Sequence, residues 1–303
     1  MLVLLVAPNA QARMADRTHS NFGFSVEGGF SHLFFGQNLS PFAGFAAPFY
    51  GGGAGAALFY ELQHRHLLFR VGFGIDFTAN TCRFNSPDYT ASIAEYPSML
   101  YHYDFHHFKE TTSYGIGYVP VLFGGLFEKF FFLVGAKIGV LPFATFTQPA
   151  TQVTIWATDN DVIDPLEEIY THQMKDYAFS GQRVPMDVNR LNVMGSLELG
   201  VNLDRVLWSD VNPRHMTTSE KAKHYRLSFF LDYGFSNLFR YMANTDANVE
   251  GGLYAFNGVS DITPFSMFGY AAHQRAWLNN LMVGIKFAFM YELPRRSGLC
   301  RCR

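Results

Sequence analysis

The chain has 303 residues, of which 49% are hydrophobic, 17% aromatic and only 16% charged. The charged fraction is well below the roughly 25% of a soluble domain, and the abundant Phe and Gly are weak helix formers, so a soluble helical protein is disfavoured. A net charge of −2 gives no reason to expect a nucleic-acid partner. The longest apolar stretch, Phe130 to Phe143, is interrupted by Lys137, so it falls short of the roughly 18 apolar residues of a membrane-spanning helix.

The first residues resemble a secretory signal peptide. Leu2 to Ala7 form a short apolar run, and Ala10-Gln11-Ala12 matches a cleavage site flanked by small residues. No positive charge precedes the apolar run, as in a signal peptide that has lost its beginning. We therefore expect residues 1–12 to be a signal peptide and residues 13–20 a periplasmic N-terminal segment.

Strict alternation of large apolar with small or polar residues recurs along the rest of the chain. In the segment LSFFLDYGFS, every second residue from Leu227 is large and apolar, whereas Ser228 and Asp232 fall between them. Alternation over ten or more residues predicts strands longer than the usual five or six residues. The pattern predicts eight strands near residues 21–35, 52–63, 67–79, 112–125, 130–142, 191–203, 225–237 and 279–292.

The residues between the large apolar ones decide which face is outside. They are mostly Gly, Ala and Ser with an occasional charge, a composition that would coat a soluble barrel poorly but would fit a crowded lumen. The Phe, Leu, Val and Tyr face suits hydrocarbon, and apolar-out, polar-in strands are typical of outer-membrane barrels. We therefore predict an all-β fold, a single antiparallel up-and-down transmembrane β-barrel over residues 21–293.

The connections between the predicted strands alternate in length. Residues 64–66, 127–129 and the longer 204–224 would form turns at one end, and an even strand number returns both termini to that end. Because such barrels place short turns in the periplasm and long loops outside, we expect both termini, including a basic tail at 294–303, to be periplasmic. The extracellular loops would be residues 36–51, 80–111, 143–190 and 238–278.

A barrel of ten strands is the alternative. The segment MLYHYDFHHF, residues 99–108, also alternates, and a second crossing would then lie within residues 251–271. We favour eight strands, with both segments forming hairpin extensions above the membrane.

Three segments carry a family resemblance. IGYVPVLFGG (116–125), followed by a turn and FFFLVGAKIGV (130–140), is similar to the central strand–turn–strand of PorT-type outer-membrane barrels of the Bacteroidota, and LMVGIKFAFMY (281–291) is similar to that family's last strand. Tyr118 stands where the family often has an acid, and the chain continues beyond the last strand. The resemblance implies an outer-membrane barrel over most of residues 21–293, and some members of that family serve in protein secretion.

The predicted inward face carries ten charges, six acidic and four basic. A conduction path or a buried catalytic site would use such groups, but an eight-stranded barrel is just wide enough for its own side chains to fill it. Because unpaired buried charges are costly, we expect the ten inward side chains to pair with one another and to fill the lumen. The residues are Glu27, Glu61, Arg70, Asp76, Lys137, Glu198, Arg226, Asp232, Lys286 and Glu292.

Two clusters outside the strands have metal-binding residue types. His102, Asp104, His106 and His107 would suit Zn²⁺ but lack a partner motif, and the acidic segment TDNDVID lacks the glycine and terminal Glu of a Ca²⁺ loop. Its acids are Asp159, Asp161 and Asp164. We interpret both clusters as polar loop surface and predict no catalytic residue, cofactor or metal site.

These observations predict a non-enzymatic outer-membrane barrel, a structural or accessory subunit of an envelope or secretion assembly. The alternatives are a surface receptor that binds through its long loops and, more distantly, a lipid-modifying enzyme. The expected partners are outer-membrane lipid, lipopolysaccharide and other envelope proteins. Cys82, Cys300 and Cys302 form no paired framework.

Overall fold

The structure is a computed structural model, and it describes the barrel almost completely. The described residues are 18–35, 49–83, 89–93, 96–106, 109–148, 150–159, 173–179, 184–185, 188–204, 222–238, 254–256, 262–264 and 278–293.

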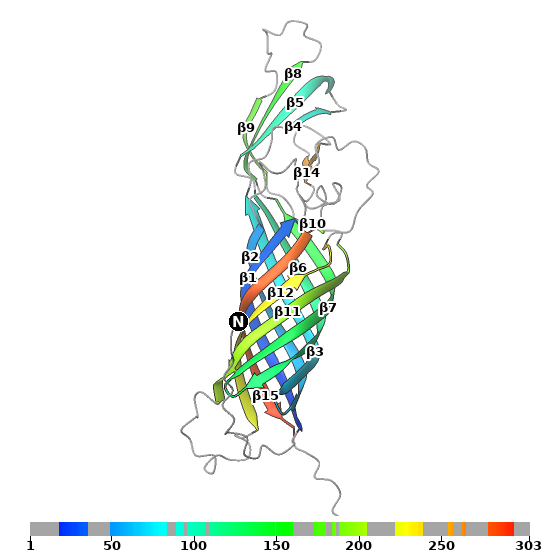
Figure 1. Cartoon of the computed structure of the whole chain (residues 1–303). Helices are drawn as coiled ribbons and strands as arrows, with labels where there is room; N and C mark the ends of the chain where they lie inside the picture. The colour runs from blue at the N-terminus through cyan, green and yellow to red at the C-terminus, as the bar shows by residue number, and fades with distance from the viewer. Residues whose placement is uncertain are drawn as a thin grey trace, which may run out of the picture.

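Eight long strands form a closed antiparallel ring, as the sequence predicted (Figure 1). Each strand pairs with its neighbours in the chain, and β1 closes the ring by pairing with β15 along fifteen residue positions. Closure gives every long strand a hydrogen-bonded neighbour on both sides, which a chain in hydrocarbon requires. The eight are β1 (Thr18–Phe35), β2 (Phe49–His64), β3 (Leu67–Arg83), β6 (Lys109–Phe127), β7 (Phe130–Thr147), β11 (Leu191–Asn202), β12 (Lys223–Gly234) and β15 (Leu278–Glu292). The two-residue strand β10 (Val184–Pro185) adds to β7 beside this ring.

Several strands run beyond the predicted bounds. β1 begins at Thr18, so residues 18–20, expected in the periplasmic segment, belong to the barrel. Thr18 pairs with His64 at the end of β2. The hydrogen-bonded pairing of β1 and β2 therefore extends beyond the alternating apolar residues from which the strand was predicted. The signal-peptide residues 1–12 and the tail 294–303 lie outside the described residues.

The two ends of the barrel differ. At one end, here called the turn end, β2 and β3 are joined by Arg65-His66, and β6 and β7 by Glu128-Lys129. Arg65 and Glu128 have φ of 54° and 48°, the left-handed conformation that tight hairpin turns use. β1 starts and β15 stops at this end, which also holds the longer connection between β11 and β12. The connections that follow β1, β3, β7 and β12 leave from the opposite, loop end (Figure 1).

A separate four-stranded sheet lies beyond the loop end (Figure 1). The segment that raised the ten-stranded alternative is β5 (Tyr96–His106), and it pairs with β4 (Tyr89–Ile93) and β8 (Ala150–Asp159) rather than with the barrel. β9 (Gln173–Phe179) completes the sheet. Within residues 251–271, β13 (Tyr254–Phe256) and β14 (Ile262–Pro264) pair only with each other. The eight-stranded prediction is therefore confirmed, and the ten-stranded alternative is wrong.

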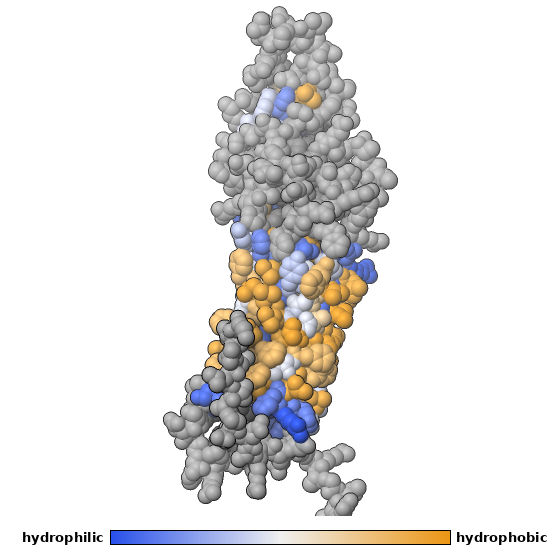
Figure 2. All heavy atoms as spheres, in the orientation of Figure 1, coloured by the Kyte–Doolittle hydropathy of each residue, from blue (hydrophilic) through white to orange (hydrophobic). Residues whose placement is uncertain are grey.

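The outside of the barrel is an apolar belt between polar ends (Figure 2). Phe229 is 69% exposed, whereas its neighbours Ser228 and Phe230 are only 3% and 2% exposed. An exposed apolar surface of this extent is a membrane-facing surface rather than a solvent coat. The large apolar residues of the predicted strands thus face outward, toward lipid. Among the described residues, no helix is long and apolar enough to cross a membrane.

Candidate functional site

The candidate site is the lumen of the barrel, where buried charged side chains form a network of ion pairs. Nine of the ten predicted inward charges lie inside the barrel, and none of the nine is more than 5% exposed. The tenth, Glu292, lies at the rim of the turn end, where its side chain is 30% exposed and contacts His19. Its direction was predicted correctly, but its height along the barrel places it outside the buried network.

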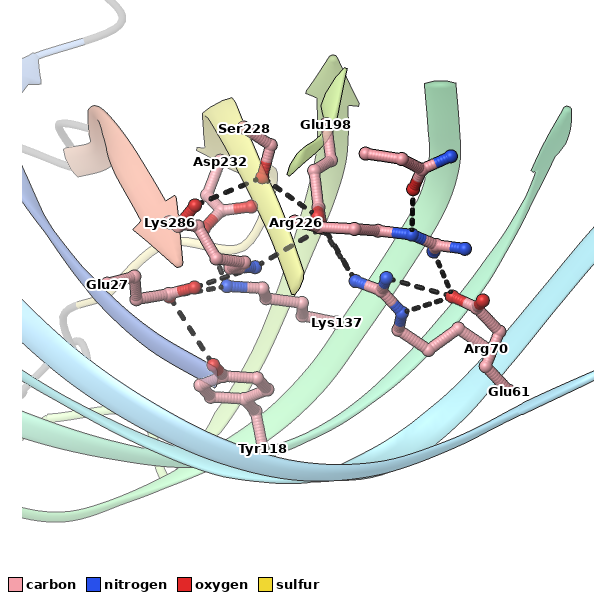
Figure 3. Close-up of polar contacts among 11 residues, drawn as sticks. Glu27, Glu61, Arg70, Tyr118, Lys137, Glu198, Arg226, Ser228, Asp232 and Lys286 are labelled. Atoms are coloured by element: carbon pink, nitrogen blue, oxygen red, sulfur yellow. Dashed lines mark hydrogen bonds and ion pairs between the residues drawn. The ribbon is translucent and has the colours of Figure 1, made fainter. Parts of the chain in front are cut away.

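The part of the network nearer the turn end is organised by two arginines (Figure 3). Arg70 and Arg226 both bind the same carboxylate oxygen of Glu61, at 2.9 and 2.7 Å. Arg70 also donates from Nη1 to both carboxylate oxygens of Glu198, at 3.0 and 3.1 Å. Ser228 Oγ donates a further hydrogen bond of 3.0 Å to Glu198.

The part nearer the loop end is organised by two lysines (Figure 3). Lys137 Nζ lies 2.7 Å from Asp232 and 3.0 Å from Glu27, with Asp76 farther away at 3.7 Å. Lys286 Nζ lies 2.6 Å from Glu27 and 3.5 Å from Glu198. Lys286 therefore connects the two parts into one network.

The ion pairs cross the lumen instead of following one strand pair. Lys137 on β7 and Glu27 on β1 lie on strands that are four places apart in the ring of eight, directly opposite each other. All eight long strands contribute to the network, β6 through Tyr118, whose hydroxyl donates to Glu27 at 3.4 Å. The same tyrosine ring lies 4.3 Å from Lys137 Nζ, in cation–π geometry. These contacts fill the cross-section of the barrel.

Small inward residues make room for the network, as the Gly-rich inward face suggested. A methyl group on Gly55 would collide with the carboxylate of Asp76, and one on Gly74 would collide with the ring of Tyr118. Because larger residues would displace these groups, the glycines are part of the site.

Three of the carboxylates resemble a metal site, but a lysine occupies its centre. Oxygens of Glu27, Asp76 and Asp232 lie within 4.8 Å of one another. The ammonium group of Lys137 contacts all three residues, so it supplies the positive charge that a cation would bring. We conclude that Lys137 and these carboxylates form an ion-pair assembly.

The structure describes only part of the histidine and aspartate clusters that were predicted in the loops. His102 is half-buried and stacks on Trp156 with a ring separation of 5.1 Å. The side chains of Asp104, His106, His107, Asp159, Asp161 and Asp164 lie outside the described residues, as do Cys300 and Cys302, whereas Cys82 is buried in β3.

Sequence reasoning missed two polar features. Gln148 donates a 2.6 Å hydrogen bond to the buried carboxylate of Glu110 near the loop end. At the turn end, His19, Asp204, His224 and Glu292 form a cluster. The signal was present in the alternation, because His19 and His224 have the inward parity of Asn21 and Arg226 on their strands.

We predict that the barrel does not conduct ions appreciably. Besides the ion pairs, Phe230, Met282 and Met290 are buried in the lumen, and an eight-stranded barrel has little space beyond its own side chains. Planar-bilayer recordings of the purified protein should show no stable openings. Large, long-lived conductance steps would contradict the filled lumen.

No protein-family model and no curated protein matches the chain. Among solved structures, Neisserial surface protein A is similar with 8% sequence identity and a TM-score of 0.24, over 88% of this chain and 95% of that one. A mutant of the TodX monoaromatic hydrocarbon channel is similar with 8% identity and a TM-score of 0.17, over 91% of each chain. At these values, the likenesses carry no argument about function.

Proposed function

We propose that the chain is a non-enzymatic outer-membrane β-barrel, a structural or accessory subunit of an envelope or secretion assembly. The observation that carries this proposal is the filled lumen, because ion pairs between strands that are not neighbours cross the middle of the barrel and leave no solute path through it within the described residues. The apolar belt supports a position in a bilayer. Outer-membrane lipid and lipopolysaccharide are then the molecules in contact with this belt.

A surface receptor or binding barrel is the second candidate. It is favoured by the four-stranded sheet of β4, β5, β8 and β9, which extends beyond the loop end. Loops held on a rigid barrel are common binding surfaces. A lipid-modifying enzyme gains no support from the lumen, whose charges are engaged with one another.

Co-purification from native membranes in mild detergent separates the two candidates. An accessory subunit should bring other envelope proteins with it at fixed stoichiometry, and the PorT-type resemblance favours secretion components among them. Isolation of the barrel alone with a captured ligand would instead favour the receptor.

We predict that the turn end faces the periplasm. A Lys129→Cys variant reports on the turn end and a Lys109→Cys variant on the loop end, since both lysines are exposed. In a background without the three native cysteines, a membrane-impermeant maleimide should label Lys109→Cys in intact cells and Lys129→Cys only after permeabilisation. The reverse labelling would invert the orientation.

A further inference from the structure

A cavity of about 110 Å³ lies at the turn end of the barrel. Its lining includes the inward side chains of the last layer of the barrel, among them His19 of β1, His224 of β12 and Glu292 of β15. The order of strands in the sheet places β15 between β12 and β1, so Glu292 lies between the two histidines. Asp204, which follows β11, adds a second carboxylate to this lining.

These four side chains form a chain of contacts. His19 Nδ1 lies 2.7 Å from Glu292 Oε1, and His224 Nε2 lies 3.9 Å from Glu292 Oε2. The other ring nitrogen of His224, Nδ1, lies 2.9 Å from Asp204 Oδ2. A carboxylate bound to one nitrogen of a histidine fixes the ring and leaves the second nitrogen available as a ligand, as in many metal sites.

Two further acceptor atoms at the cavity, Asn21 Oδ1 and Asp204 Oδ1, have no hydrogen-bond partner among the described residues. Asn21 is 3% exposed. A buried acceptor without a donor is costly, so a group that satisfies Asn21 Oδ1 must bring positive charge or hydrogen-bond donors.

The charges around the cavity also favour a cation. Arg226 lines the cavity, but its guanidinium group is bound to Glu61 at 2.7 Å and to Asn202 at 2.7 Å. Among the described residues, the ion-pair partners of the Asp204 and Glu292 carboxylates are the two histidines and not this arginine.

We propose that this cavity binds a divalent first-row transition-metal ion, with His19, His224 and Glu292 as ligands and Asp204 as the residue that orients His224. Imidazole and carboxylate groups are the ligand types that Zn²⁺ and its neighbours take up.

The proposal requires His19, His224 and Glu292 to rotate onto one ion, because among the described residues only Glu27, Asp76 and Asp232 already hold ligand atoms within 4.8 Å of one another. The side chains of His19, His224 and Glu292 are 37%, 30% and 30% exposed, so they are only partly enclosed. Ligand bonds of about 2.0–2.2 Å require Glu292 to withdraw from direct contact with His19. Water or Asn21 Oδ1 would complete the coordination.

Zn²⁺ titration of the full chain, folded in detergent, tests the proposal. The background carries Cys300→Ser and Cys302→Ser, because thiolates would bind Zn²⁺ themselves. We expect one saturable Zn²⁺ per barrel by isothermal titration calorimetry. His19→Ala and His224→Ala should each weaken binding by at least about tenfold.

The matched control is His64→Ala, because His64 is an exposed histidine at the same end that contacts Thr18 outside the cavity. Its affinity should equal that of the parent, and heat-modifiable gel migration should show that all variants are folded. Co²⁺ bound in place of Zn²⁺ should give the visible spectrum of nitrogen and oxygen ligation. Absence of binding by the folded parent, or equal affinity of His224→Ala and the parent, would overturn the proposal.

Discussion

Replacement of Lys137 with methionine should lower the free energy of unfolding of the barrel by about 3–5 kcal/mol. Methionine keeps much of the volume but removes the ammonium group that contacts three carboxylates. Asp232 would lose its 2.7 Å ion pair and Asp76 its 3.7 Å one. A buried charge without a partner is the costly outcome of such a truncation, and Lys137 is 1% exposed.

Denaturant unfolding in lipid vesicles measures this effect. Lys129→Met, in the exposed turn between β6 and β7, is the matched control and should change stability by less than about 0.5 kcal/mol. Adding Asp232→Asn to Lys137→Met should recover part of the loss, because one unpaired charge is then removed. Equal stabilities of Lys137→Met and Lys129→Met would show that the lumen network is not formed.

Replacement of Phe229 with lysine should make folding into bilayers less favourable by about 2–4 kcal/mol. Phe229 lies in the middle of β12 and is 69% exposed on the apolar belt. Its cross-strand neighbours, Leu199 and Ile285, are also exposed and apolar. A lysine at this place would put its ammonium group in hydrocarbon or force it to extend toward the membrane surface.

Ser228→Asn is the control for this variant. Ser228 is adjacent in sequence but faces the lumen, and asparagine can keep a hydrogen bond to Glu198. We expect a much smaller loss than for Phe229→Lys in the same vesicle assay. Equal losses would mean that the inward and outward faces of β12 are assigned wrongly.

The face of each strand was predictable from the sequence because alternation has a period of two. Within each strand, alternate residues point to opposite faces. This rule assigned Glu27 and Lys137 to the lumen and Phe229 to the outside, and the structure agrees. The partners of each charge were not predictable. Lys137 meets Glu27 across the lumen only because β7 and β1 are opposite in the ring and those residues lie at the same height, and height depends on the stagger between strands.

The same limit explains the position of Glu292 and why the sequence left a ten-stranded alternative open. Glu292 has inward parity, but the stagger places it at the rim beside His19. β5 alternates as a membrane strand does, yet it belongs to the sheet beyond the loop end, because alternation does not reveal whether a strand's neighbours lie in the barrel. The tyrosines buried in that sheet, Tyr101 and Tyr103, pack against protein rather than lipid.

The most direct test of the central claim is cross-relaxation between lipid acyl chains and methyl groups of the protein in lipid nanodiscs. The claim is that the large apolar face contacts lipid and that the lumen is filled with protein. Leu199 and Ile285 are 51% and 52% exposed, whereas Leu122 and Leu133 are 2% and 0% exposed. We predict strong transfer from acyl chains to the methyl groups of Leu199 and Ile285 and none to those of Leu122 and Leu133. Equal transfer to all four, or the reverse pattern, would contradict the account.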